Sequence, residues 1–166
     1  MIGIQGIELP DENYHTEKRN RFGDAADFLA RSNRIFSHDP SVQDYFYSAM
    51  HEAESFLARL GIHSRNHNQR ENFVTNYMVQ SLGTVVSRAQ FSRNPRHPAD
   101  RLFDNDSEFY YMQLLSLRLD VVYGNEILGR LRHANRRDVQ RARELRVRFL
   151  NSISRHEQNL RHRGII

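Results

Sequence analysis

The spacing of apolar residues between positions 40 and 60 constrains the fold more than any other feature of the chain. Apolar side chains recur there at three- and four-residue steps, which is the period of one face of an α-helix. Asp39 can cap the start of this helix, Pro40 suits its first position, and Gly61 suits the left-handed residue after its last turn. A helix with one apolar face needs other elements to cover it, so a packed helical core is predicted. The apolar residues are Val42, Tyr45, Phe46, Ala49, Met50, Ala53, Phe56, Leu57 and Leu60.

The same helical period recurs in four other parts of the chain. Asn135 can cap the last of these helices, because its side chain can accept a hydrogen bond from a free amide of the first turn. Residues 92–100 contain two prolines among small polar residues and predict a loop. No convincing strand pattern is found, so we predict an all-α fold. The four helices are predicted over about residues 24–36, 69–91, 107–124 and 135–160.

The first 22 residues differ from the rest because they carry no sustained apolar stripe. We expect residues 1–22 to form a loosely attached arm, with a short extended stretch at residues 2–9. Residues 23–166 then form one helical domain, which at this length can bury a core of its own. The predicted architecture is an antiparallel bundle of about five helices.

The residue types and motifs that are missing exclude several classes of protein. The chain has no cysteine, which excludes a disulfide framework and thiolate metal ligands. No apolar run approaches about 18 residues, and residues 10–19 lack the apolar centre of a signal peptide. The sequence therefore predicts a soluble cytoplasmic protein that does not enter a membrane. Without a Gly-rich phosphate loop, a dinucleotide fingerprint or a Ser nucleophile motif, no cofactor is predicted.

Arginine supplies almost all of the positive charge. Lys18 is the sole lysine beside 23 arginines, and the formal net charge is +4. Codon composition of the source genome can produce this bias, and so can a need for phosphate contacts, which the planar guanidinium makes well. Placement is more informative, because arginines crowd between positions 130 and 148. We predict an RNA-binding surface there, the alternative being an ordinary solvated helix face. The predicted RNA contacts are Arg130, Arg132, Arg136, Arg137 and Arg141.

Arg118 lies on the apolar side of the helix predicted at residues 107–124. An arginine is seldom buried without a partner, so three alternatives are open: a structural ion pair, a subunit interface, or a site that receives an anion. At about 100° per residue, five apolar residues fall within about 60° of Arg118. They are Tyr111, Leu114, Leu115, Val121 and Val122.

Two segments, together with the number of helices, resemble prokaryotic HEPN-domain proteins. Residues 44–67, which read DYFYSAMHEAESFLARLGIHSRNH, are similar to the aromatic-rich second helix of that family and the loop after it, with His67 matching the loop histidine. Residues 117–124, which read LRLDVVYG, look like the family's Leu-Arg-x-x-Ala-Asp-Tyr-Gly segment, and residues 143–153 fit its closing helix. The likeness covers about residues 24–160, and the ordered combination is more specific than either motif.

The resemblance implies a compact helical bundle that often pairs into homodimers, and it also implies an activity. Many members are metal-independent ribonucleases with an Arg-x(4–6)-His motif. The arginine stabilises charge on the phosphate, and the histidine helps to move a proton from the ribose 2′-hydroxyl. Arg118 matches the family arginine, but Tyr123 stands five residues later in place of the histidine. Tyrosine is a poor base near neutral pH because its ordinary pKa is about 10.

Two functions follow from this departure, and both stay open. The first is a module with a degenerate Arg-x4-Tyr motif that binds RNA, or a protein partner such as a nucleotidyltransferase, in a toxin–antitoxin or defence setting. The second is an active endoribonuclease that uses Arg118 with a repositioned proton-transfer group. His67 is the best candidate for that group. Arg118, Tyr123 and His67 are therefore the candidate catalytic residues.

Two other histidine arrangements carry less weight. Arg155 and His162 have a nuclease-like spacing, but that spacing arises easily in a chain with so many arginines and histidines. His63 and His67 are four residues apart and follow Gly61 in a predicted loop, without an obvious carboxylate companion. No metal site is predicted from them.

Overall fold

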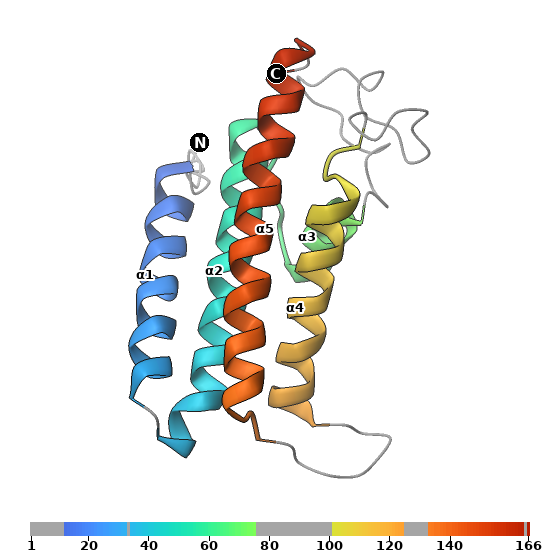
Figure 1. Cartoon of the computed structure of the whole chain (residues 1–166). Helices are drawn as coiled ribbons and strands as arrows, with labels where there is room; N and C mark the ends of the chain where they lie inside the picture. The colour runs from blue at the N-terminus through green and yellow to red at the C-terminus, as the bar shows by residue number, and fades with distance from the viewer. Residues whose placement is uncertain (1–11, 33, 76–100, 125–132, 165) are drawn as a thin grey trace, which may run out of the picture.

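In the computed structural model, four long helices stand side by side, and each runs opposite to the long helix before it in the chain (Figure 1). The structure describes residues 12–32, 34–75, 101–124, 133–164 and 166. Within these residues all regular structure is helical, which confirms the predicted all-α bundle. The elements are α1 (Glu12–Arg31), the 3-10 turn η1 (Ile35–Ser37), α2 (His38–Arg59), α3 (His67–Val74), α4 (Asn105–Tyr123) and α5 (Arg136–His162).

α2 is the central helix, with α1 on one side and α4 and α5 on the other (Figure 1). Every residue of its predicted apolar stripe is buried, which confirms the stripe. The ring centroid of Phe46 lies 5.7 Å from that of Tyr111 on α4, and Tyr111 lies 5.5 Å from Phe149 on α5. Each such pair adds about 0.5–1.5 kcal/mol to the energy of burial, so the three rings tie α2, α4 and α5 together.

α1 is longer at its start than the sequence predicted. It begins at Glu12, whereas the first helix was predicted over residues 24–36. The expectation of a loose arm was therefore wrong for residues 12–22. The boundary predicted between residues 22 and 23 falls inside α1, while residues 1–11 lie outside the described part of the chain.

The packing of α1 explains why an apolar pattern missed it. The residues that α1 buries are His15, Gly23 and Ala26, which are polar or small and make no apolar stripe. Arg19 pairs at 2.5 Å with the carboxylate of Glu52, a buried residue of α2. We call this polar packing of α1 on α2 the α1–α2 seam.

Asn135 and Gly61 have the predicted roles at the ends of helices, whereas Asp39 does not. Asn135 caps α5 as predicted, since its side chain accepts two backbone amides of the first turn at 2.8 and 3.1 Å. Gly61 has the predicted left-handed conformation, with φ of +71°. The prediction for Asp39 was wrong, because α2 begins at His38. The Asp39 carboxylate instead accepts the backbone N–H of Ala134 at 2.5 Å and ties the start of α2 to the start of α5.

α3 corresponds to the first part of the helix predicted at residues 69–91 and begins two residues earlier, at His67. Asn66 caps it by accepting the backbone N–H of Gln69 at 2.9 Å. The later part of that predicted helix, the loop at residues 92–100 and the extended stretch at residues 2–9 lie outside the described residues. Of the helices described, none has the length and apolar character needed to cross a membrane.

Candidate functional site

Arg118 is half-buried on α4 and faces α2. Its guanidinium carbon lies 5.1 Å from the ring centroid of Phe46 and 5.3 Å from that of Tyr47, and Nη2 donates to the Tyr47 hydroxyl at 3.3 Å. The buried Nε has no hydrogen-bond partner. No carboxylate among the described residues pairs with this arginine, so a structural ion pair has no support there. Arg118 is therefore a half-buried cation whose charge no carboxylate of the described residues balances.

Tyr123 and His67 are not gathered around Arg118. Tyr123 is the last residue of α4, and 61% of it is exposed. His67 is the first residue of α3, and its Nδ1 contacts the guanidinium of Arg70. Arg118 and His67 therefore have separate partners, and within the described part of this single chain no hydrogen bond, ion pair or ring contact joins either of them to the other or to Tyr123.

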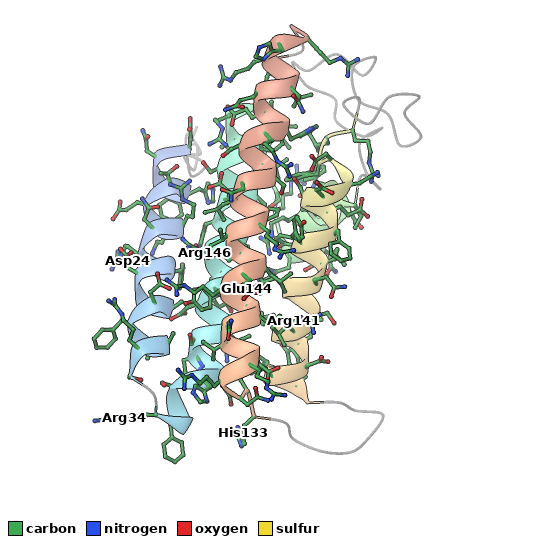
Figure 2. All side chains as sticks on the ribbon, in the orientation of Figure 1. Asp24, Arg34, His133, Arg141, Glu144 and Arg146 are labelled. Carbon is green, nitrogen blue, oxygen red and sulfur yellow. The ribbon has the colours of Figure 1, made fainter. Side chains whose placement is uncertain are left out.

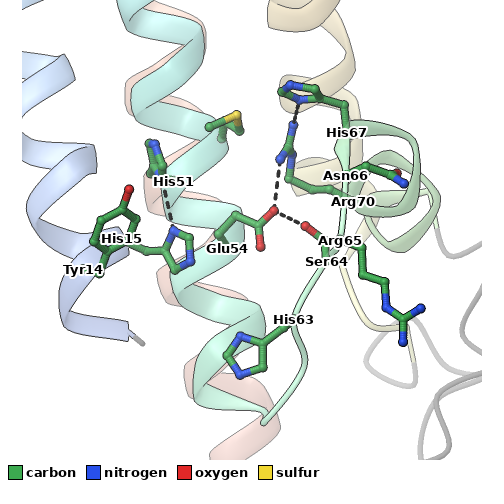
Figure 3. A pocket seen from close by; sticks show the side chains of 11 residues that line it. Tyr14, His15, His51, Glu54, His63, Ser64, Arg65, Asn66, His67 and Arg70 are labelled. Atoms are coloured by element: carbon green, nitrogen blue, oxygen red, sulfur yellow. Dashed lines mark hydrogen bonds and ion pairs between the residues drawn. The ribbon is translucent and has the colours of Figure 1, made fainter. Parts of the chain in front are cut away.

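The partner of His67 belongs to a buried network that joins α2, α3 and α4. Arg70 donates from Nη1 to Glu54 at 3.0 Å and from Nε to the hydroxyl of Tyr111 at 3.0 Å. Ser64 also hydrogen-bonds to the same carboxylate oxygen of Glu54 (Figure 3). Because Arg70 can only donate, Nδ1 of His67 accepts its N–H, and in the neutral imidazole the proton lies on Nε2.

Two imidazoles that contact each other lie across α2 from this network. Nδ1 of His15 on α1 lies 3.1 Å from Nδ1 of His51 on α2 (Figure 3). Burial lowers the pKa of His51 to about 4, and the charges of His15, Arg70 and Lys18 act in the same direction. His51 is therefore neutral near pH 7, and one of the two facing nitrogen atoms carries the shared proton.

These groups line a cleft of about 480 Å³ between α1, α2 and α3. Tyr14 and His15 form one wall, and the chain from His63 to His67 forms the other, above α2 (Figure 3). We call it the α1–α2–α3 cleft. Its volume falls within the range of about 300–1,000 Å³ that is common for ligand sites. Among the described residues, no three His, Asp or Glu side chains are grouped so that they could hold a metal ion.

The predicted arginine surface lies partly in α5. Arg136, Arg137 and Arg141 are exposed in its first turns, whereas Arg130 and Arg132 lie outside the described residues. α5 as a whole carries eight arginines and three carboxylates. Arg146 belongs to a different environment, because it is half-buried and donates from Nε to Ser48 at 2.8 Å. Figure 2 shows Arg141 on the α4 side of α5 and Arg146 on the α1 side.

Three of the arginines on α5 form a row beside α4. Arg141, Arg148 and Arg155 are seven residues apart, so they lie on nearly one face at intervals of about 10 Å. We call them the arginine row. Their partners on α4 are Gln113 for Arg141, at 3.0 Å, the ring of Tyr110 for Arg148, at 6.0 Å, and Asp106 for Arg155, at 3.2 Å.

Sequence reasoning missed the network around Arg70, although the signal that selected Arg118 was also present at Glu54. Glu54 lies within about 60° of Met50 and Leu57 on the helical wheel and is thus an acid on a buried stripe. It is 6% exposed in the structure. A buried carboxylate needs a cation, but the sequence does not indicate that Arg70 supplies it.

Arg155 and His162, the other pair with nuclease-like spacing, have separate partners. Arg155 pairs with Asp106, and Nδ1 of His162 lies 3.0 Å from the backbone oxygen of Gln158. Comparisons of the chain with protein-family models, curated proteins and solved structures found no match.

Proposed function

We propose that this protein is a HEPN-like RNA-binding module in which the catalytic motif is degenerate. The arginine row beside Tyr110 is the observation that supports this best. A single-stranded RNA presents phosphates at regular intervals and bases that stack on aromatic rings, and a row of cations with an aromatic neighbour matches both. A toxin–antitoxin or defence role would follow from the family resemblance.

The charges in the row favour an external anion. Among the described residues, Arg141 and Arg148 have neutral partners, so neither guanidinium is balanced by a carboxylate there. The ring of Tyr110 already holds Arg148, and Phe109 beside it is 57% exposed with its ring centroid 5.5 Å away. Phosphate oxygens can bind the guanidinium groups, and a base can stack on the exposed ring.

The degenerate form of the proposal is supported by the positions of the motif residues. Tyr123 ends α4 and is largely exposed, Arg118 contacts rings of α2, and His67 contacts Arg70. A general acid–base group typically contributes about 10²–10⁴-fold to a rate, provided that it lies within hydrogen-bond reach of the proton it moves.

Fluorescence anisotropy with a labelled single-stranded RNA tests the proposal. We expect affinity to fall linearly with salt on logarithmic axes, with a slope of about −0.7 for each phosphate contacted on a single strand. The triple variant Arg141→Gln, Arg148→Gln, Arg155→Gln should bind weakly and have a shallower slope. The double variant Arg136→Gln, Arg137→Gln tests the predicted contacts at the start of α5.

The control changes the net charge equally away from the row, with Arg21→Gln, Arg34→Gln and Arg161→Gln. If the control and the row variant lose affinity equally, RNA binding does not depend on the row. If the wild-type protein binds no RNA even at low salt, the proposal fails, and a protein partner such as a nucleotidyltransferase is favoured.

A second candidate function is metal-independent cleavage of RNA. The half-buried guanidinium of Arg118 supports it, since no carboxylate of the described residues balances this cation and such a cation can stabilise charge on a phosphate. RNA cleavage that persists in a chelator and is abolished by Arg118→Ala would establish this function. It would contradict the proposal that the catalytic motif is degenerate. Without such cleavage, Tyr123→His should create or raise activity, because an imidazole has an ordinary pKa of about 6.5.

The resemblance also supports a homodimer in which α4 meets its copy. Leu119 and Tyr123 are 40% and 61% exposed on this helix and lie one turn apart. Light scattering at micromolar concentration should give about twice the chain mass of 19.7 kDa. A monomer throughout that range would remove any site shared between two subunits.

A further inference from the structure

A pocket of about 530 Å³ opens beside the arginine row, between α4 and α5. Tyr110 of α4 lines it, together with Arg148 and Arg155 of the row. The rest of its described lining is polar and neutral and comes from α5: Asn151, Ser154 and Gln158. Ligand sites commonly have volumes of about 300–1,000 Å³, so the pocket has room for one base of a nucleic acid.

Asn151 lies between the two arginines along α5. It comes three residues after Arg148 and four before Arg155, so each arginine is its neighbour on the helix surface. At about 100° per residue, both arginines lie within about 60° of Asn151, which points further from the buried Phe149 than they do. All three side chains are exposed. The amide of Asn151 is therefore presented to solvent between two cations.

The amide of Asn151 is free to bind a ligand. It can donate and accept hydrogen bonds, and it has no partner among the described residues. Other amides nearby are already used, because Gln113 accepts from Arg141 at 3.0 Å and Gln140 donates to Glu144 at 3.1 Å. A ligand can thus reach Asn151 without breaking a hydrogen bond of the fold.

The groups around this amide have the chemistry that recognises an unpaired base. Bases stack on aromatic rings and on guanidinium planes, and the pocket supplies both, with the guanidinium carbon of Arg148 6.0 Å from the ring centroid of Tyr110. The edge of an unpaired base carries donors and acceptors that an amide can match. None of the described lining residues is a carboxylate, which would repel the phosphates on either side.

We propose that this pocket binds one unpaired base of the RNA and that Asn151 recognises the edge of that base. The inference rests on the proposed RNA binding by the arginine row, and it adds a preference among RNA sequences. An amide is complementary to adenine, whose N6 donates and whose N7 accepts, whereas guanine presents two acceptors at the same edge. Adenine is therefore the expected base, with Arg148 and Arg155 beside the neighbouring phosphates.

Fluorescence anisotropy with labelled single strands of equal length tests the pocket, using oligomers of adenosine, uridine and cytidine and a ribose-phosphate strand without bases. The adenosine oligomer should bind at least about fivefold more tightly than the strand without bases, which is the lower limit for one stacked base. It should also bind about fivefold more tightly than the other two oligomers.

Asn151→Leu is the decisive variant, because it removes the amide and nearly keeps the size of an exposed side chain. The affinities for the three oligomers with bases should become similar, and the salt slope should stay as in the wild type, since no charge is lost. The row variant should instead weaken binding of every strand. Asn13→Leu is the matched control, because it removes an exposed amide from α1, on the other side of α2 from α4 (Figure 1). It should keep the preference for adenosine.

Equal affinity of the wild type for all four strands would overturn the pocket and leave RNA binding by the row intact. A base preference that survives Asn151→Leu, or that Asn13→Leu removes as well, would overturn the role of Asn151. Failure to bind any strand at low salt would overturn the proposed function, and this inference with it.

Discussion

The α1–α2 seam and the core between α2, α4 and α5 cover two sides of the same helix by different chemistry. In the core, rings such as Phe56 and Phe103 meet at 5.1 Å and are fully buried. In the seam, Arg19 pairs with Glu52, and the hydroxyl of Tyr45 donates to Asp27 at 2.6 Å. α2 is thus held on one side by apolar area and on the other largely by polar pairs, beside the ring of Phe22, which stacks on His51.

The difference teaches how each side tolerates change. Apolar burial is non-directional and contributes about 25 cal/mol for each Å² removed from water, so the loss follows the volume that is deleted. A polar pair depends on both partners, and deleting one leaves the other without compensation. The stability of core variants should therefore depend on the volume of side chain that is deleted. The stability of seam variants should depend on whether a polar or charged partner is left unpaired.

The largest expected effect is a deletion in the core. Phe56→Ala removes a fully buried ring that contacts Phe103 and His156, and it should lower the free energy of unfolding by about 3–5 kcal/mol. Urea denaturation measures this loss. Phe109→Ala removes the same ring from an exposed position and should change stability by less than about 0.5 kcal/mol. Similar losses for both variants would contradict the assignment of the core.

The next effect concerns the seam at low pH. The folded state holds the pKa of His51 at about 4, below the ordinary value of 6.5, so the unfolded chain binds more protons between these values. Stability from this group is present above pH 6.5 and falls as the pH is lowered to 4; because the ring keeps partial contact with water, the loss should be well below the roughly 3.4 kcal/mol that the full shift would give. His51→Gln should flatten this profile when unfolding is measured at several pH values.

The pH profile has its own controls. Burial also lowers the pKa of His156, so part of the acid sensitivity should persist in His51→Gln. His162→Gln, at an exposed position, should leave the wild-type profile unchanged. An NMR titration that finds an ordinary pKa for His51 in the folded protein would contradict the prediction directly.

The same contrast explains what the sequence could predict about the fold. The apolar stripe of α2 and the extent of α5 were predicted closely, because apolar burial appears in a sequence as spacing. The start of α1 was missed because Arg19, Thr16 and His15 stabilise it through particular partners on α2. Polar pairing depends on which residues meet in space, and one chain read alone does not reveal this.

For the candidate site too, the sequence predicted the direction of side chains but not their partners. The position of Arg118 on an apolar face was predictable from the helical period, but its contacts with Phe46 and Tyr47 depend on how α4 packs on α2. His67 was selected by resemblance, and the structure pairs it with Arg70, a residue that no motif had marked. A helical wheel gives the direction of a side chain and does not give its distance from another helix.

The third prediction tests whether the seam is stabilised by the charges themselves or only requires that no charge is left without a partner. Glu52→Leu leaves Arg19 and Arg59 without a buried carboxylate that now lies 2.5 and 3.6 Å from them. Both arginines retain some access to water, so the expected loss is about 1–3 kcal/mol, below the value for a fully buried pair. The double variant Arg19→Met, Glu52→Leu should recover most of this loss in urea denaturation. A double variant less stable than Glu52→Leu would mean that the seam requires the charges themselves.

The smallest expected effect on stability belongs to the arginine row. Arg155 and Asp106 are 3.2 Å apart, but their side chains are 63% and 59% exposed, and exposed pairs contribute only about 0–1 kcal/mol. Arg155→Ala should therefore change the urea midpoint little, and a double-mutant cycle with Asp106→Ala should give a coupling energy below about 0.5 kcal/mol. The RNA affinity of Arg155→Ala should nevertheless fall, because a cation facing a phosphate contributes to binding without contributing to folding. A large coupling energy would instead make the pair part of the structure, and it would remove Arg155 from the proposed RNA surface.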